Sequence, residues 1–135
     1  LRTPHGRPIL SIEPFRCNLL SDFPLRMSKE TTNRVKNLAI PGVSSESLLA
    51  GFLVLEPGNR VRRHYHDIEE FQYIAYGNGV ARDLLGTEQL VYPGSVIYCA
   101  AGREGAHEFE NNTDLPLAIL FIYPNVAETT WVEFQ

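Results

Sequence analysis

The chain has 135 residues, of which 44% are hydrophobic and 21% are charged, and its formal net charge is -4. This length suits one domain with its own core rather than two, and the composition is that of an ordinary soluble globular protein. The acidic balance argues against nucleic-acid binding, which needs a clustered excess of Lys and Arg. No stretch approaches the roughly 20 apolar residues of a membrane span.

The cysteines and the N-terminus give little sign of special chemistry or targeting. Cys17 and Cys99 have no CxxC spacing, so a redox or zinc-finger motif is not indicated, and free thiols are expected. The first residues lack the basic-then-apolar pattern of a secretory signal, although a signal removed before residue 1 would leave no trace. We therefore expect a cytoplasmic protein.

Residues 1–34 are predicted to form an irregular arm. Pro4, Pro8, Pro14 and Pro24 interrupt any regular element there, leaving room for one edge strand. The arm is expected to wrap the domain or a neighbouring subunit.

From residue 35 to residue 135, short β-rich runs alternate with turn signals, and Asn78-Gly79 is typical of a hairpin. The expected strands are 35–40, 48–55, 64–66, 71–76, 80–85, 90–92, 95–99, 106–109 and 117–123. Short runs at regular spacing with almost no 3.6-residue periodicity favour a β-sandwich or β-barrel. The sequence predicts an all-β domain over residues 35–135.

Two histidines separated by one residue form half of a candidate metal site. Because side chains alternate along a strand, His64 and His66 share a face if this stretch is extended. A turn through Asp67 would bring Glu70 back beside them, and Glu69 is an alternative carboxylate.

A second half of the site follows Pro93-Gly94. His107 and Asn111 lie downstream, and four residues separate Gly102 from His107. Three histidines and a carboxylate would then be available.

Together these segments resemble the paired motifs of the cupin superfamily over about residues 50 to 124. Gly58, five residues, HxH, three residues, Glu70, six residues and Gly77 match the first motif at every defining position. The second motif departs from the family pattern, because Ala100 stands where proline is usual and the Gly102 to His107 spacing is longer. The resemblance implies a double-sheet jelly-roll barrel and favours Glu70 over Glu69. The implied metal ligands are His64, His66, Glu70 and His107.

This set of donors suits one divalent transition-metal ion: Fe, Mn, Zn, Ni or Co. Without a thiolate nearby, a structural zinc site is not indicated. In an octahedral ion, four protein ligands leave two cis positions for water, oxygen or substrate, which is typical of catalytic or ligand-binding sites.

Strand alternation extends the predicted site beyond the ligands. If Glu70 faces inward, Gln72 and Tyr76 do as well, and in the second motif we favour the face of Tyr98 as inward. We predict catalytic roles for Gln72 and Tyr98 and substrate contacts for Tyr76. Arg62 would share the face of His64 and could meet a bound anion.

These features predict an enzyme that acts on a small oxygen-bearing metabolite by metal-assisted proton transfer, as an isomerase, lyase or cyclase. An iron-dependent dioxygenase and a non-catalytic binding cupin are the alternatives. Cupins that cleave dimethylsulfoniopropionate have a similar layout, but some place a tyrosine where this chain has Gln72. Apolar outward faces, represented by Phe71/Tyr73 and Ile97/Cys99, predict a homodimer or larger assembly.

Overall fold

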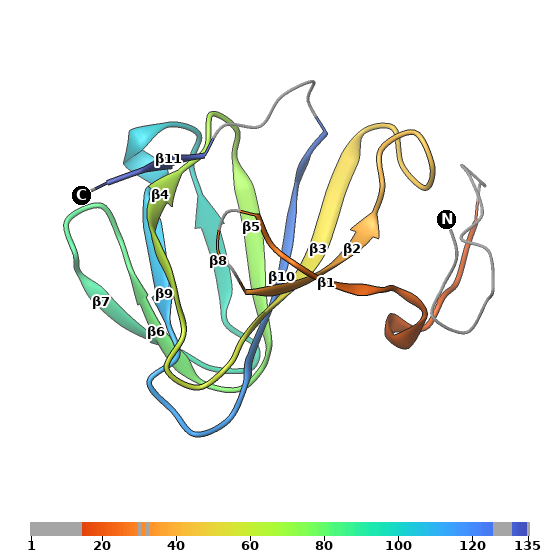
Figure 1. Cartoon of the computed structure of the whole chain (residues 1–135). Helices are drawn as coiled ribbons and strands as arrows, with labels where there is room; N and C mark the ends of the chain where they lie inside the picture. The colour runs from red at the N-terminus through yellow and green to blue at the C-terminus, as the bar shows by residue number, and fades with distance from the viewer. Residues whose placement is uncertain (1–14, 30, 32, 126–130, 135) are drawn as a thin grey trace.

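The computed structural model describes residues 15–29, 31, 33–125 and 131–134, which form β-strands and two short 3-10 helices (Figure 1). The elements are η1 (Leu20–Asp22), β1 (Leu25–Met27), β2 (Arg34–Ala39), β3 (Leu48–Leu55), β4 (Arg60–Tyr65), β5 (Glu70–Tyr76), β6 (Gly79–Arg82), β7 (Glu88–Val91), β8 (Val96–Cys99), η2 (Arg103–Gly105), β9 (His107–Glu110), β10 (Leu117–Pro124) and β11 (Val132–Glu133). No helix in this part of the chain has the length and apolar character needed to span a membrane.

The strands form two antiparallel sheets that face each other (Figure 1). The first sheet has the order β1-β2-β3-β10-β5-β8, and the second has the order β11-β4-β9-β6-β7. From β3 to β11 the chain passes from one sheet to the other at every step except the β6–β7 hairpin. This is the winding of a jelly roll, so the prediction of an all-β double-sheet barrel is confirmed.

The core lies between the two sheets because apolar side chains alternate along the strands. In β5, residues 70, 72 and 74 are buried while 71, 73 and 75 are exposed. The fully enclosed cluster is built around Leu55, Ile74, Phe109, Leu117 and Ile119. These residues gather toward one end of the barrel, which leaves the other end for polar side chains.

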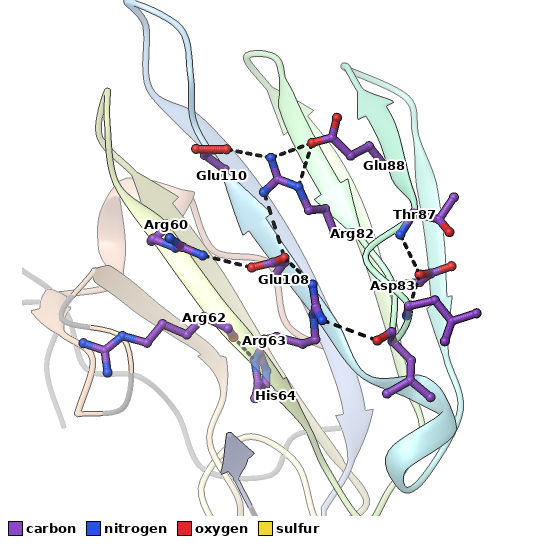
Figure 2. A network of polar contacts seen from close by, with 12 residues as sticks. Arg60, Arg62, Arg63, His64, Arg82, Asp83, Thr87, Glu88, Glu108 and Glu110 are labelled. Carbon is purple, nitrogen blue, oxygen red and sulfur yellow. Dashed lines mark hydrogen bonds and ion pairs between the residues drawn. The ribbon is translucent and has the colours of Figure 1, made fainter. Parts of the chain in front are cut away.

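On the outer face of the second sheet, ion pairs connect the strands. Glu108 on β9 is buried and accepts hydrogen bonds from Arg60 at 3.1 Å and from Arg63 at 2.9 Å (Figure 2). Arg82 on β6 pairs with Glu110 at 2.9 Å. These contacts link β4, β9 and β6 across the sheet, and they direct Arg63 away from the barrel interior.

The expected hairpin at Asn78-Gly79 is wrong. β5 lies in the first sheet and β6 in the second, so the chain crosses between sheets at this point. The crossing needs close backbone approach, since a Cβ at Gly77 would collide with the Pro116 carbonyl and one at Gly79 would lie 2.7 Å from the Glu110 carbonyl oxygen. The two glycines serve this passage instead of a tight turn.

The predicted arm overlaps the first sheet. β1 pairs with β2, which makes Leu25–Met27 an edge strand. Residues 1–14 of the arm lie outside the described residues. The division into an arm of residues 1–34 and a barrel of residues 35–135 stays a prediction.

Candidate metal centre

Four side chains from both sheets converge at one end of the barrel. His64 lies in β4, His66 follows the end of that strand, Glu70 opens β5 and His107 opens β9. β4 pairs with β9 so that His64 lies opposite His107. Glu70 approaches from the facing sheet. The fold therefore joins two sequence segments that are 37 residues apart at their nearest ligands, Glu70 and His107.

The distances among these side chains are those of a candidate metal-binding group. The ligand nitrogens of His64, His66 and His107 all lie within 4.8 Å of one another. Oε1 of Glu70 lies 3.5 Å from Nε2 of His107 and 3.9 Å from Nε2 of His66. Glu70 and His107 also form a group with Cys99 by the same criterion.

Two of the imidazoles are oriented by the backbone. Nδ1 of His64 donates to the Arg62 carbonyl at 2.8 Å, and Nδ1 of His107 donates to the Gly105 carbonyl at 2.9 Å. With Nδ1 protonated, Nε2 of each ring carries the lone pair that can bind a cation. Burial lowers the pKa of His64 to about 3 and that of His107 to about 4, so both rings are neutral near pH 7.

Glu70 is the strongest sign that a cation belongs here. Its Oε1 atom is buried and has no hydrogen-bond partner, although a buried polar atom normally has one. Burial raises the pKa of this carboxyl to about 7, against a smaller lowering effect of the Gln72 side chain. A positive ion beside Oε1 would satisfy it and restore the carboxylate. The residues present thus fit a metal ion.

A cavity of about 230 Å³ opens over these four side chains. Its remaining walls come from both sheets, from the segment around β1 and from the C-terminal segment. They are Arg26, Ser28, Thr31, Val35, Asn37, Leu49, Leu53, Val61, Gln72, Phe109, Ile119, Phe121, Tyr123 and Trp131. The four candidate ligands therefore line a small chamber that can receive a ligand.

The family of the chain follows from its sequence as well as from this geometry. Residues 51–123, more than half of the chain, match the model of the family described as the cupin domain. The chain belongs to the cupin domain family. No curated protein sequence matches this cupin.

Solved structures share the fold of this cupin. The polyketide cyclase RemF from Streptomyces resistomycificus has a TM-score of 0.79 and 16% identity, with 90% of this chain and 86% of that chain covered. A sugar phosphate isomerase of the cupin superfamily from Silicibacter pomeroyi has a TM-score of 0.65 and 27% identity, with 84% and 73% covered. The DMSP lyase DddQ from Ruegeria pomeroyi has a TM-score of 0.68 and 20% identity, with 82% covered here but 60% of the lyase.

Gln72 lies beside the candidate metal ligands of this cupin. It is 6% exposed, and its Nε2 lies 3.3 Å from Nε2 of His107. Its Oε1 faces the Cys99 thiol at 3.9 Å, and burial raises the pKa of that thiol to about 12. The thiol is therefore protonated and can donate to Oε1 of Gln72. The amide N–H groups of Gln72 are then directed toward His107.

The expectation that Tyr98 faces inward is wrong. Tyr98 is 54% exposed, its hydroxyl donates to Glu69 at 3.0 Å, and this bond raises its pKa. Cys99 is buried instead, and Ile97 packs on the core. The register explains the difference, because β8 pairs with β5 so that Cys99 lies opposite inward-facing Glu70. Alternation along β8 allows either Val96 and Tyr98 or Ile97 and Cys99 to face inward, and the sequence alone does not distinguish these two arrangements.

Tyr76 also leaves the predicted face, and a bulge is the reason. Ile74 lies opposite Ile119 and Tyr76 lies opposite Ala118, so β5 has one residue more than β10 at this point. The extra residue reverses the alternation, and Tyr76 is 53% exposed. Its predicted substrate contact is not supported by this position.

Arg62 is displaced by a second bulge. Val61 lies opposite Phe109 and His64 opposite His107, so β4 carries one extra residue between them. Arg62 therefore does not share the inward face of His64. Its guanidinium is directed away from Glu108 (Figure 2) and lies 3.6 Å from Glu133.

Sequence reasoning missed three cavity residues. Tyr123 stacks near His66, with ring centroids 6.1 Å apart, and Trp131 stacks on His64 at 3.5 Å with an interplanar angle of 9°. Arg26 enters from β1. The inward phase of β10 could have suggested Tyr123, since Ile119, Phe121 and Tyr123 alternate. Nothing local in the sequence indicates that Trp131 returns to β4.

Proposed function

We propose that this cupin is a metal-dependent enzyme that acts on a small oxygen-bearing metabolite by proton transfer, as an isomerase, lyase or cyclase. The observation that carries the proposal is the orphaned Oε1 of Glu70 facing the Nε2 atoms of His66 and His107. Sites that keep room for a ligand beside the metal are catalytic more often than structural. The similar structures include a cyclase, an isomerase and a lyase, which supports this range of reactions.

His64, His66, Glu70 and His107 would hold one divalent transition-metal ion. When bound, the ion would supply Lewis acidity to the carbonyl or carboxylate oxygens of a substrate. The backbone bonds of His64 and His107 hold the imidazoles in the tautomer that the ion requires. The stacked indole of Trp131 fixes the plane of His64.

Two further side chains have suitable positions for the reaction. The amide of Gln72 can donate to a substrate oxygen, because its N–H groups already point at the ligands. The phenol of Tyr123 lines the cavity and can exchange a proton with a carbon next to a polarised carbonyl. Apolar wall residues such as Leu53, Phe109 and Ile119 lower the polarity around both groups, which strengthens these interactions.

The test is proton exchange in heavy water. Metal-loaded protein is incubated with a panel of small hydroxy, keto and dicarboxylic acids, and deuterium entry at carbon is followed by NMR while dissolved oxygen is recorded. We expect exchange or product formation without oxygen consumption. Stoichiometric oxygen consumption with no exchange would replace the proposal with the dioxygenase alternative.

Once a substrate is known, Gln72→Ala and Tyr123→Phe should each lower kcat by about 100-fold, the usual cost of losing one positioned donor or acid–base group. Metal content should stay near that of the wild type, because neither residue binds the ion. Tyr98→Phe is the matched control, since the same hydroxyl is lost on the outer surface. Equal kcat for Tyr123→Phe and Tyr98→Phe would remove Tyr123 from the mechanism.

We also propose that the protein is a homodimer through the outer face of the first sheet. Neighbouring strands there present apolar side chains to solvent: Phe71, Tyr73, Val96, Tyr98 and Ile122 are between 39% and 69% exposed. A contiguous apolar patch of this kind is uncommon on a monomer. Inward-facing Ile97 and Cys99, expected on this surface, do not contribute to it.

Light scattering at micromolar concentration should therefore give about twice the chain mass of 15.2 kDa. Phe71→Glu combined with Tyr73→Glu should shift the protein to a monomer by placing charge in the contact. A wild-type mass equal to one chain would contradict the dimer.

A further inference from the structure

The cavity has an aromatic wall that a glycine makes possible. Phe121 and Tyr123 on β10 stack with centroids 5.7 Å apart and an interplanar angle of 14°. Phe121 lies opposite Gly51 on β3, and a Cβ at Gly51 would collide with the Phe121 ring. The ring therefore leans over the sheet in the space of the missing side chain. This leaves an extended, flat surface beside the metal centre.

A single cation lies on the far side of the chamber. Arg26 on β1 lines the cavity, and its guanidinium donates to the Asn37 side chain at 3.2 Å and to the Met27 carbonyl at 3.2 Å. Both acceptors are neutral, so the charge of Arg26 is not matched by a carboxylate among the described residues. An arginine in such a position can take a carboxylate or another oxyanion from a ligand.

Arg26 and the candidate metal ligands line the same cavity from different strands. β1 is four strands from β5 in the first sheet, which is roughly 19 Å at about 4.8 Å per strand in a flat sheet. Because both line one cavity, the curl of the barrel brings them closer than this flat spacing. Arg26 is thus placed to meet the end of a ligand that is remote from the metal.

The net charge of the cavity also favours a ligand that carries a carboxylate or another oxyanion. Among its described residues, Arg26 and Glu70 are the only ones from the group Arg, Lys, Asp and Glu. Their charges cancel, so a divalent ion would leave the chamber with a net charge of about +2. The volume of about 230 Å³ lies below the roughly 300–1,000 Å³ of pockets for drug-sized molecules.

Resting on the proposed function, we propose that the substrate is a small, flat, conjugated or aromatic acid. Its chelating oxygens would bind the ion that His64, His66, Glu70 and His107 would hold, its planar body lies on Phe121 and Tyr123, and its carboxylate pairs with Arg26.

The experiment uses zinc-loaded protein, because zinc has no redox chemistry that could consume the probes. The probes are 3,4-dihydroxybenzoate and catechol, which share the chelating end and the ring but differ in the carboxylate. Binding is followed by the fluorescence of Trp131, the one tryptophan of the chain, which stacks on His64. Calorimetry gives an independent dissociation constant.

We expect the dihydroxybenzoate to bind about tenfold more tightly than catechol, as one added charge pair allows. Arg26→Gln should remove this difference, while Arg34→Gln, which neutralises an arginine outside the cavity on the neighbouring strand, should keep it. Phe121→Leu should weaken both probes, whereas Phe71→Leu on the outer face should weaken neither.

Equal affinity of the two probes for the wild type, or an undiminished preference in Arg26→Gln, would overturn the assignment of the carboxylate to Arg26. Zinc content measured on the same samples separates the two proposals. Protein that holds no zinc would overturn the proposed function and this inference together. Protein that holds zinc but does not distinguish the probes would overturn the inference alone.

Discussion

The double variant His64→Ala/His66→Ala is expected to lose bound metal almost completely, from about one ion per chain to less than about a tenth, and to lose turnover with it. Of the four candidate ligands only Glu70 and His107 would remain, and the neighbouring Cys99 thiol is protonated near neutral pH, so these groups should not retain a transition-metal ion through purification. The fold should persist, because the core around Leu55, Ile74 and Ile119 contains neither histidine.

The measurement is elemental analysis of protein purified without a polyhistidine tag, together with circular dichroism. His5→Ala is the control, since His5 is the chain's one histidine that is not among the four candidate ligands. Metal at wild-type stoichiometry in the double variant would show that the ion binds elsewhere.

Glu70→Gln is expected to have opposite effects on the metal-free and metal-bound protein. In the metal-free state, burial raises the pKa of Glu70 from its ordinary value of 4.5 to about 7. The folded protein then binds a proton more tightly than the unfolded chain, so stability falls as pH rises from about 4.5 to about 7. The full cost above pH 7 is about 3 kcal/mol, and the glutamine removes most of it.

Urea unfolding in the presence of a chelator should therefore show Glu70→Gln to be more stable than the wild type at pH 8. At pH 4.5 the difference should be near zero. With metal present, the variant should bind the ion more weakly, because a neutral amide replaces a carboxylate. Glu69→Gln is the control on the exposed neighbouring residue, and an equal stability gain in Glu69→Gln would contradict the assignment of the cost to Glu70.

The histidines act in the opposite direction along the pH scale. Burial lowers the pKa values of His64 and His107 to about 3 and about 4, so the unfolded chain binds protons before the folded one does. Their contribution to stability is present above about pH 6.5 and is lost as pH falls through these folded values. The metal-free protein should thus be penalised at both ends of the range, by the histidines in acid and by Glu70 near neutrality.

The strands and the four candidate ligands could be predicted from the sequence because both rest on short patterns. Runs such as 48–55 and 117–123 coincide with β3 and β10 almost residue for residue. His64, His66 and Glu70 lie within seven consecutive residues. His107 was reached through the family resemblance, and the ladder of β4 with β9 brings it to His64.

The side chains around the ligands could not be predicted in the same way. Tyr98 and Tyr76 depend on which phase a ladder adopts and on whether it contains a bulge, and both properties are set by the partner strand. Arg26 and Trp131 come from segments at opposite ends of the sequence. They reach the cavity because β1 and β11 are edge strands of the two sheets, and no local sequence pattern predicts this placement.

The extra residue in β4 gives the first motif a meaning beyond its length. Before the bulge an odd-numbered residue, Val61, faces the interior, and after it an even-numbered residue, His64, does so. With strict alternation over this length, Arg63 would face inward in place of His64, and the extra residue of the bulge prevents this. The five residues between Gly58 and His64 therefore encode a parity, because a regular strand of the same length would exchange the inside and the outside of the barrel at the candidate metal centre, whereas deletion of one bulge residue would leave His64 facing inward.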